Sequence, residues 1–232
     1  MDVNFGRTYL KNLKHTSMET LVFIPSFNDQ LSLDPLVNEI ISNYKRTCVL
    51  IIDDGSKEML KINCRSKRVI VFRLPINVGL GVTTSIALGV AMKNNFKYFL
   101  RLDADGQHPV KYIKTLKERI VSSKTNICIG ARSNHERFNS FRGVISALLK
   151  RHLRYVANWL SSATLKDWNT GFFGLDRIGI VKMSQFAYSR YPEVEFYLRA
   201  HNIGLKVSTM SIYQKERDSG KSSIDLLQSI MY

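Results

Sequence analysis

Short apolar runs alternate with helical patterns along the first half of the chain, and this alternation restricts the possible folds most. The apolar runs are Leu21–Ile24, Cys48–Ile52, Val69–Phe72 and Tyr98–Leu102. Apolar residues recur at helical spacing over 33–44 and again over 82–94. Strands that alternate with helices are typical of an open sheet whose strands are largely parallel. The sequence therefore predicts an α/β fold in which helices flank a mostly parallel central sheet.

Polar residues follow three of these runs at the point where each predicted strand ends. They form the clusters Pro25–Asn28, Asp53–Ser56 and Asp103–Gln107. Open α/β sheets bind their ligands outside the carboxyl ends of the strands. We therefore expect the three clusters to meet at one edge of the sheet and to form a binding site there.

Asp103 and Asp105 stand two residues apart at the end of an apolar run. Burial and mutual repulsion both disfavour two bare carboxylates at such a place. A divalent cation would relieve both effects, because hard cations prefer carboxylate oxygens and Mg²⁺ also binds substrate phosphates. A surface turn with two solvated aspartates is the alternative, and this motif alone does not decide between them.

The second half of the chain continues with helices and strands but also contains a long basic segment. We predict helices over 110–121 and 192–202 and strands over 127–130, 172–175 and 207–213. From Phe138 to about Leu160, apolar residues recur at helical spacing with arginines and lysines between them. This segment is either a core helix with a solvated basic face or a helix lying on an anionic membrane surface. The amphipathic end, Ile224–Tyr232, could add to such a contact.

Charge and cysteine content limit the partners and the compartment. The net charge of +15, from 34 Lys+Arg and 19 Asp+Glu, indicates a polyanionic neighbour such as nucleic acid, anionic lipid or a phosphorylated substrate. We see no zinc finger and no RNA motif with interleaved aromatic residues, so a basic nucleic-acid-binding module is the weaker interpretation. Three cysteines without CxxC spacing suit a reducing cytosol. We find neither a signal peptide nor an apolar run of the ~18 to 20 residues that span a bilayer.

Short motifs follow one another in order over most of the chain. They are VFIPSFND at 22–29, IIDDGS at 51–56, NVGLG at 77–81, LDADGQHP at 102–109, GAR at 130–132, DWNTGFFG at 167–174, YPEVE at 191–195 and RDSGKSS at 217–223. The ordered set resembles the family 2 glycosyltransferases, whose fold is called GT-A, from about Leu21 to Tyr232. The DADGQH run and the late R-x-x-G-x-S pattern are especially similar to polyprenyl-phosphate mannosyl- and glucosyltransferases and to bacterial surface-polysaccharide transferases.

The resemblance implies a nucleotide-sugar site at the predicted sheet edge. The positions that it assigns to this site are Pro25, Asn28, Asp53, Asp54, Gly81, Asp103, Ala104, Asp105, Arg132, Arg217, Lys221 and Ser222. Asp53 would accept a hydrogen bond from the base, and Asp54 or its neighbours would hold the ribose. The structural alternative for both aspartates is an Asp-Gly turn between strand and helix. Arg217, with Lys221 as a second candidate, would contact the diphosphate from a flexible loop, and an ordinary solvated loop is the alternative.

The resemblance also implies that Asp103, Asp105 and Gln107 hold Mn²⁺ or Mg²⁺ against the donor diphosphate. The cation would act as a Lewis acid toward the departing nucleoside diphosphate. Ligands that are all oxygen argue against zinc. We interpret His108 as a turn or supporting residue rather than as a ligand. Gly81 would let a helix pack closely, with the backbone near the nucleotide.

An inverting transfer to a sugar hydroxyl needs a base within hydrogen-bond reach. The resemblance points to Glu193 and Glu195, with Asp167 in reserve. Two residues apart on a helix, the glutamates point in different directions, so one of them would serve. We favour Glu193, because the N-terminus of a helix more often faces a cleft. A lipid phosphate acceptor is already ionised and needs no base, and Glu195 would then be structural.

Together these observations predict a single GT-A (Rossmann-like) domain over 20–232, preceded by an extension over 1–19. Residues 20–107 would bind the nucleotide sugar and residues 108–232 the acceptor. We expect a metal-dependent inverting glycosyltransferase that moves a sugar from a UDP- or GDP-sugar to a lipid-linked or saccharide acceptor in bacterial cell-surface polysaccharide (O-antigen or capsule) synthesis. A polyprenyl-phosphate mannose or glucose synthase is the close alternative. The expected location is the cytoplasm, with peripheral contact with the anionic cytoplasmic membrane.

Overall fold

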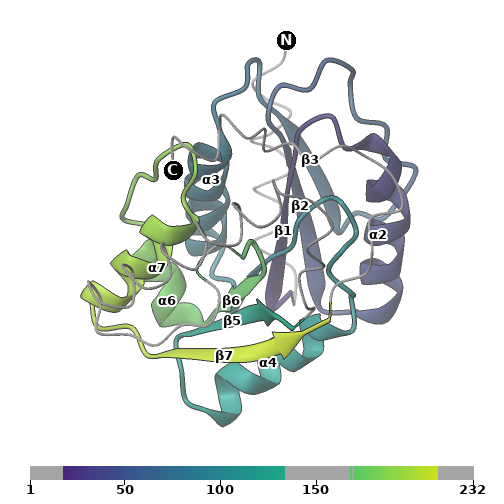
Figure 1. Cartoon of the computed structure of the whole chain (residues 1–232). Coiled ribbons are helices and arrows are strands. Elements are labelled where there is room, and N and C mark those ends of the chain that lie inside the picture. Colours follow the sequence, from purple (N-terminus) through teal and green to yellow (C-terminus); the bar gives the residue numbers. More distant parts are fainter. Residues whose placement is uncertain (1–17, 134–167, 169, 214–232) are drawn as a thin grey trace, which may run out of the picture.

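The computed structural model describes residues 18–133, 168 and 170–213 (Figure 1). The strands are β1 Thr20–Ser26, β2 Thr47–Asp53, β3 Val69–Arg73, β4 Tyr98–Arg101, β5 Ile127–Arg132, β6 Phe173–Leu175 and β7 Val207–Ile212. The helices are α2 Gln30–Asn43, α3 Leu80–Lys93, α4 Tyr112–Ser122, α6 Arg177–Met183 and α7 Glu193–Asn202. These elements follow the predicted order, with the short helix α6 as an addition.

The strands form one seven-stranded sheet in the order β3-β2-β1-β4-β6-β5-β7. Parallel pairing joins β1 to β2 and β4, β2 to β3, and β5 to β7. The short strand β6 is antiparallel to both of its neighbours, β4 and β5. The predicted α/β fold with a mostly parallel sheet is therefore confirmed.

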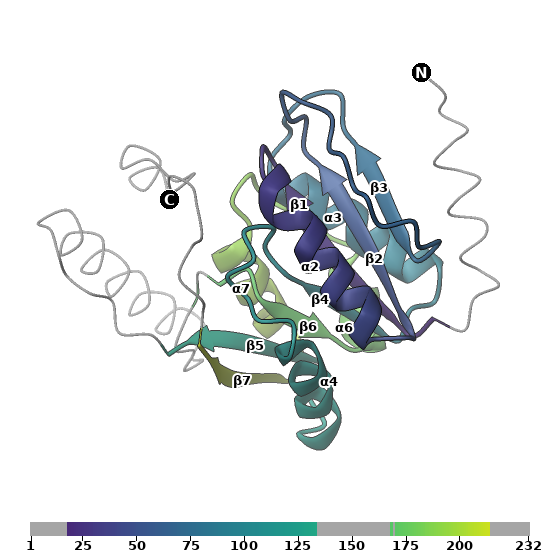
Figure 2. The same ribbon diagram turned by 90° about the vertical axis from the view of Figure 1, so that its right-hand side faces the viewer.

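Helices cover both faces of this sheet (Figures 1 and 2). The inner strands β1 and β2 are buried on both sides, whereas the edge strands β3 and β7 are partly exposed. Successive strand residues face opposite sides. Leu21 and Phe23 pack into the core with α3, α6 and α7, whereas Val22 and Ile24 pack into the core with α2 and α4. Burial on both sides explains why β1 and β2 are apolar at nearly every position instead of alternating with polar residues.

Strand β1 continues through Pro25 to Ser26, although the sequence predicts that it ends before the proline. Proline has no N–H to donate to a neighbouring strand. Strand β4 pairs with β1 only as far as Phe23, so Pro25 has a paired neighbour on one side, Ile52 of β2. The extension brings Ser26 level with Asp53 and carries β1 to the polar edge of the sheet.

Helix α2 begins at Gln30, three residues before the predicted start at 33, and contains Pro35. Its side chains fasten the loop that follows β2. Gln30 exchanges hydrogen bonds with the backbone of Lys61, and the Asp34 carboxylate accepts a bond of 2.8 Å from the Asn63 amide. These long-range bonds are invisible to a pattern of apolar spacing, which explains the error in the predicted helix start.

Several predicted features lie outside the part that the structure describes. They are residues 1–17 of the expected extension, the basic segment 138–160 and the amphipathic end 224–232. Within residues 18–133, 168 and 170–213, no helix is long and apolar enough to cross a membrane.

Candidate active site

The carboxyl ends of β1, β2 and β4 meet at one edge of the sheet, where the sequence predicts the polar clusters. Ser26, the last residue of β1, pairs with Asp53, the last residue of β2. Arg101 ends β4, and Asp103 follows it by two residues. This edge therefore gathers acidic side chains from segments 50 residues apart in the sequence.

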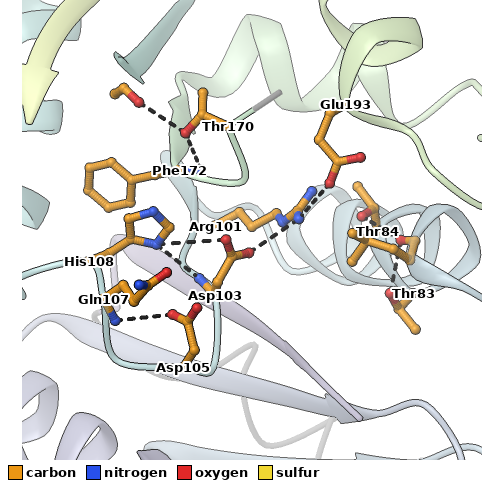
Figure 3. Close-up of polar contacts among 12 residues, drawn as sticks. Thr83, Thr84, Arg101, Asp103, Asp105, Gln107, His108, Thr170, Phe172 and Glu193 are labelled. Carbon is orange, nitrogen blue, oxygen red and sulfur yellow. Dashed lines mark hydrogen bonds and ion pairs between the residues drawn. The ribbon is translucent and has the colours of Figure 1, made fainter. Parts of the chain in front are cut away.

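A buried arginine links this edge to helix α7 (Figure 3). The Arg101 side chain is 3% exposed, and its Nη2 atom donates to Glu193 Oε1 at 2.9 Å and to Asp103 Oδ1 at 3.3 Å. The sequence reasoning missed Arg101, although a charged residue inside the run YFLRL was a visible signal. Because an unpaired buried charge is costly, such an arginine must have acidic partners from elsewhere in the chain.

The charges of this cluster stabilise one another. Burial raises the pKa of Asp103, but the Arg101 guanidinium outweighs burial and lowers the pKa of this carboxyl. Burial lowers the pKa of Arg101, but Glu193 and then Asp103 outweigh it and raise that pKa. Asp103 is therefore a carboxylate and Arg101 a cation near neutral pH.

His108 is buried next to the acidic turn and supports it by contacts with Asp103 and Phe172. Its ring is 2% exposed and stacks on Phe172, with the ring centroids 4.9 Å apart. Its Nδ1 accepts a hydrogen bond from the Asp103 backbone N–H at 3.4 Å. Burial lowers the pKa of His108 despite the neighbouring carboxylates of Asp103 and Asp105, which favours a neutral ring. This geometry agrees with its interpretation as a supporting residue.

The turn after β4 presents oxygen ligands suited to a hard cation. Asp103, Asp105 and Gln107 are all partly exposed on this turn, and the Gln107 N–H donates to Asp105 Oδ1 at 3.0 Å. Gly106 between them has φ +70°, a conformation that glycine adopts without strain. Within the described residues, no group of three or more His, Cys, Asp or Glu could hold a metal ion. The carboxylate and amide oxygens of the turn are nevertheless the ligand type that Mg²⁺ and Mn²⁺ prefer, and donor oxygens and water would have to complete the coordination.

Asp53 is fully buried, and one of its two oxygens lacks a hydrogen bond among the described residues. Its Oδ1 accepts the Ser56 N–H at 2.9 Å, and its Oδ2 lies 3.6 Å from Arg73 Nε. Among the described residues, this Oδ2 has no hydrogen-bond partner. A buried acceptor without a partner is costly. Asp53 therefore suits an N–H donor from a ligand.

Asp54 is occupied differently from the ribose contact that the resemblance implies. Its two oxygens accept the backbone N–H groups of Val78 at 2.8 Å and Gly79 at 2.9 Å. The carboxylate thus holds the loop that leads into α3. In this helix, a Cβ at Gly81 would collide with the Ser189 carbonyl oxygen, so the close packing expected of Gly81 is present. The contacts of Asp54 and Gly81 with a nucleotide stay predictions.

The polar cluster Pro25–Asn28 makes hydrogen bonds to the segment that begins with Asp53–Ser56. Asn28 has φ 61° and is exposed. Its N–H donates to Ser56 Oγ at 2.9 Å, and its Oδ1 accepts the Lys57 N–H at 3.0 Å. Pro25 is half-buried in β1, at the same edge. Asn28 thus fixes the loop that follows Asp53, and Pro25 lies in the neighbouring strand β1.

The two candidate bases have different surroundings on α7. Glu193 is 7% exposed, and its Oε2 has no hydrogen-bond partner among the described residues. Glu195 uses both oxygens: Oε2 accepts the Ser189 N–H at 2.8 Å and Oε1 accepts Arg199 Nε at 2.9 Å. Burial raises the pKa of Glu195, but the bonds from Ser189 and then Arg199 outweigh it and lower the pKa. The geometry favours Glu193.

The segment before β6 packs directly against the Asp103 and Arg101 side chains. A Cβ at Gly171 would collide with the Asp103 carboxylate and lie 2.8 Å from Arg101 Nη2. The Thr170 hydroxyl donates to the Gly130 carbonyl at 3.0 Å, which fixes this segment against β5. Gly171 belongs to the motif at 167–174, but the sequence did not predict this contact with Asp103.

The remaining predicted positions differ in their burial, or they lie outside the described residues. Ala104 and Trp168 are buried, and Arg132 is exposed at the end of β5, where its charge adds to the lowering of the Asp103 pKa. The predicted residues outside the described part are Asp167, Arg217, Lys221 and Ser222.

Comparisons with known proteins found related sequences. The sequence model of glycosyl transferase family 2 matches residues 21–177. An uncharacterized protein of Methanocaldococcus jannaschii is 23% identical over 203 residues, which are 84% of this chain and 80% of that protein. The polyprenol monophosphomannose synthase of Mycolicibacterium smegmatis is 22% identical over 220 residues, which are 90% of this chain and 82% of that protein.

Solved structures share the fold. Glucosyl-3-phosphoglycerate synthase from Mycobacterium tuberculosis, in complex with Mn²⁺, UDP-glucose and phosphoglyceric acid, has a TM-score of 0.67 and 13% identity, covering 91% of this chain and 75% of that chain. The same enzyme in complex with Mg²⁺ and UDP has a TM-score of 0.67 and 12% identity, covering 92% of this chain and 76% of that chain.

Proposed function

Because this chain belongs to glycosyl transferase family 2 and has the GT-A fold, we propose that it moves a sugar from a UDP- or GDP-sugar to a hydroxyl of a lipid-linked or saccharide acceptor. The observation that carries this proposal is the cluster at the sheet edge, where Arg101 joins the acidic turn to Glu193. Family membership makes the chain a glycosyltransferase and favours this activity over a nucleic-acid-binding module.

The donor would occupy the edge formed by residues 20–107, and the acceptor would approach from the side of residues 108–232. Asp53 Oδ2 would accept an N–H of the base, because it is a buried acceptor that lacks a hydrogen bond among the described residues. Arg132, Arg217, Lys221 and Ser222 would supply positive charge and hydrogen bonds near the diphosphate. Arginine suits this contact because its planar fork donates two parallel bonds to phosphate oxygens.

Asp103, Asp105 and Gln107 would hold Mn²⁺ or Mg²⁺. When bound, the cation would neutralise charge on the departing nucleoside diphosphate. The partly exposed acidic turn supports this role, because its oxygens can reach a ligand while Arg101 and His108 hold the turn from the protein side. Asp103 would offer the cation chiefly Oδ2, since Arg101 already contacts Oδ1.

Glu193 would act as the base. In a single inverting displacement, the acceptor hydroxyl attacks the anomeric carbon and gives its proton to the carboxylate. Oε2 of Glu193 is suited to receive it, since Oε1 is engaged by Arg101 and Oε2 has no partner among the described residues. Proton transfer to Oε2 would leave Oε1 as an acceptor for Arg101 but would remove the negative charge that balances the guanidinium.

A second candidate function is a polyprenyl-phosphate mannose or glucose synthase. The Mycolicibacterium smegmatis relative, a polyprenol monophosphomannose synthase whose match covers 90% of this chain, favours it. Such an acceptor is an ionised phosphate and needs no base. A polyprenyl phosphate or another lipid-linked acceptor lies at a membrane, so we propose peripheral contact with the anionic cytoplasmic membrane. For a hydroxyl acceptor, we propose a role in O-antigen or capsule synthesis.

Donor and metal binding test the proposal first. UDP- and GDP-sugars titrated by calorimetry should bind with Mn²⁺ present and much more weakly without it. Asp105→Ala should abolish the metal-dependent part of binding, because it removes one of the oxygen ligands. Glu39→Ala, which removes an exposed carboxylate on α2, should bind as the wild type does. Binding of equal strength without metal would contradict the scheme.

Glu193→Gln separates the two acceptor classes. For a hydroxyl acceptor, the variant should lose about 100-fold or more in transfer rate at saturating donor and Mn²⁺, because the base is gone. For a lipid phosphate acceptor, the rate should change little. Radiolabelled sugar transfer to polyprenyl phosphate and to lipid-linked saccharides would measure both. A variant that stays fully active on a hydroxyl acceptor would remove Glu193 from the mechanism.

A further inference from the structure

We propose that Arg101 is a positioning residue that couples the donor side of the site to the acceptor side. It would do so by sharing one guanidinium between Asp103, a predicted metal ligand, and Glu193, the proposed base. This inference rests on the proposed function for the roles of the two carboxylates. The coupling itself follows from the contacts of Arg101.

One nitrogen makes both contacts. Arg101 Nη2 lies 2.9 Å from Glu193 Oε1 and 3.3 Å from Asp103 Oδ1 (Figure 3). The guanidinium is planar, and its N–H groups point in fixed directions. A movement that improves the contact with one carboxylate therefore alters the contact with the other.

The surroundings leave the cluster few other ways to balance its charges. Arg101 is 3% exposed and Glu193 is 7% exposed, so water reaches neither side chain freely. Glu193 Oε2 and Arg101 Nε have no hydrogen-bond partner among the described residues. Gly171 closes the same cluster, since a Cβ there would lie 2.8 Å from Arg101 Nη2. Each buried charge thus depends on the others.

The sharing has a consequence for metal binding. With Glu193 neutral, the positive charge of Arg101 is balanced by Asp103 alone, and the Asp103 carboxylate is less available to a cation. With Arg101 removed, Glu193 and Asp103 no longer share a guanidinium. The charge of Glu193 then no longer affects Asp103 through this contact. Because coupling between sites is reciprocal, a cation at Asp103 would in turn strengthen the hold of Arg101 on Glu193.

A double-mutant cycle on metal binding tests this coupling. Mn²⁺ is titrated by calorimetry into the full chain saturated with UDP, or with GDP if that base binds better. Glu193→Gln should weaken Mn²⁺ binding about fivefold or more. In the Arg101→Met background, the same Glu193→Gln change should alter the Mn²⁺ affinity less than about twofold, because no guanidinium joins the two carboxylates. Effects that simply add would overturn the inference.

A matched control and a folding check make the outcome specific. Glu195→Gln removes the same charge two residues along α7, but its carboxylate is bound to Ser189 and Arg199, so Mn²⁺ affinity should stay within about twofold of wild type. An equal loss in Glu195→Gln would count against a role for Arg101. Thermal melting checks that each variant is folded. If Arg101→Met does not fold, Arg101→Gln replaces it, since this amide keeps a donor without the charge.

Failure of this inference differs from failure of the proposed function. If the wild type binds no nucleotide in a metal-dependent way, the proposed function is wrong. If the wild type binds Mn²⁺ and nucleotide together but the effects of the two substitutions add, the coupling through Arg101 is wrong and the proposed function stands.

Discussion

At the scale of single residues, the surroundings of Asp103 depend on neighbours that the acidic motif does not contain. Arg101 pairs with its carboxylate, His108 receives its backbone N–H, and Gly171 leaves no room above it. The first contact is electrostatic, the second sets the backbone and the third is steric. Together they fix the direction in which Asp103 points, which a pair of solvated aspartates on a surface turn would not require.

Gly171→Ala should damage the site more than the fold. The added Cβ would collide with the ends of the Asp103 and Arg101 side chains, which can move, rather than with backbone. We expect transfer activity to fall about 100-fold, as for a displacement of about 1 Å in a catalytic group, with a small change in melting temperature. Activity assays and thermal melting of the same preparation would measure both. Wild-type activity in a folded variant would show that the position of Asp103 is unimportant.

At the scale of elements, the N-terminal turns of α3 and α7 position the residues around Asp54 and Arg101. The loop before α3 is tied to Asp54, and Gly81 in its first turn lies against the backbone of Ser189. Helix α7 begins at Glu193 and places this residue on Arg101. The segment between α6 and α7 therefore links the loop after β2 to the proposed base.

Substitutions of two glycines in the same helix should have opposite effects. A Cβ at Gly81 would meet the Ser189 backbone, which cannot move without shifting α7, so Gly81→Ala should destabilise the protein by about 1–3 kcal/mol. A Cβ at Gly89 would meet nothing within 4 Å, and Gly89→Ala should stabilise α3 by about 0.5–1 kcal/mol. Urea unfolding measures both. Equal effects in the two variants would contradict the packing described for Gly81.

Glu195→Gln should reveal a pH-dependent contribution of α7 to stability. The Glu195 bonds to Ser189 and Arg199 lower the pKa below its ordinary value of 4.5. Its contribution is therefore present above about pH 4.5 and lost as the pH falls through the lower folded value. We expect the variant to be about 0.5–1 kcal/mol less stable at pH 7. In urea unfolding, the two proteins should converge as the pH falls through the lowered folded value. A difference in stability that stays constant as the pH falls would refute the assignment.

At the scale of the whole molecule, the sheet joins two sets of strands through one short antiparallel strand. The strands β3, β2, β1 and β4 come from the first half of the chain, whereas β6, β5 and β7 come from the second. The short strand β6 pairs with β4 on one side and β5 on the other. The site lies where the two sets meet, since Arg101 ends β4 and Gly171 precedes β6.

Local sequence determined the fold class and the edge of the sheet at which the site lies. Apolar runs such as 48–52 specify strands buried on both faces, and parallel strands place their polar ends at one edge. These features depend on residues close together in the chain, so a single sequence contains them. Pro25 and the start of α2 were misjudged because both depend on pairing with distant segments.

Tertiary structure alone decided which charged groups meet. The contact between Arg101 and Glu193 spans 92 residues, and apolar periodicity carries no information about it. The same holds for Asp54, whose partners near Gly79 lie 25 residues away, and for the collision that a Cβ at Gly171 would make with Asp103. The residue types of the acidic turn were legible in the sequence. Their partners were set by packing, because burial forces each charge and each polar group to find a complement wherever the fold brings one.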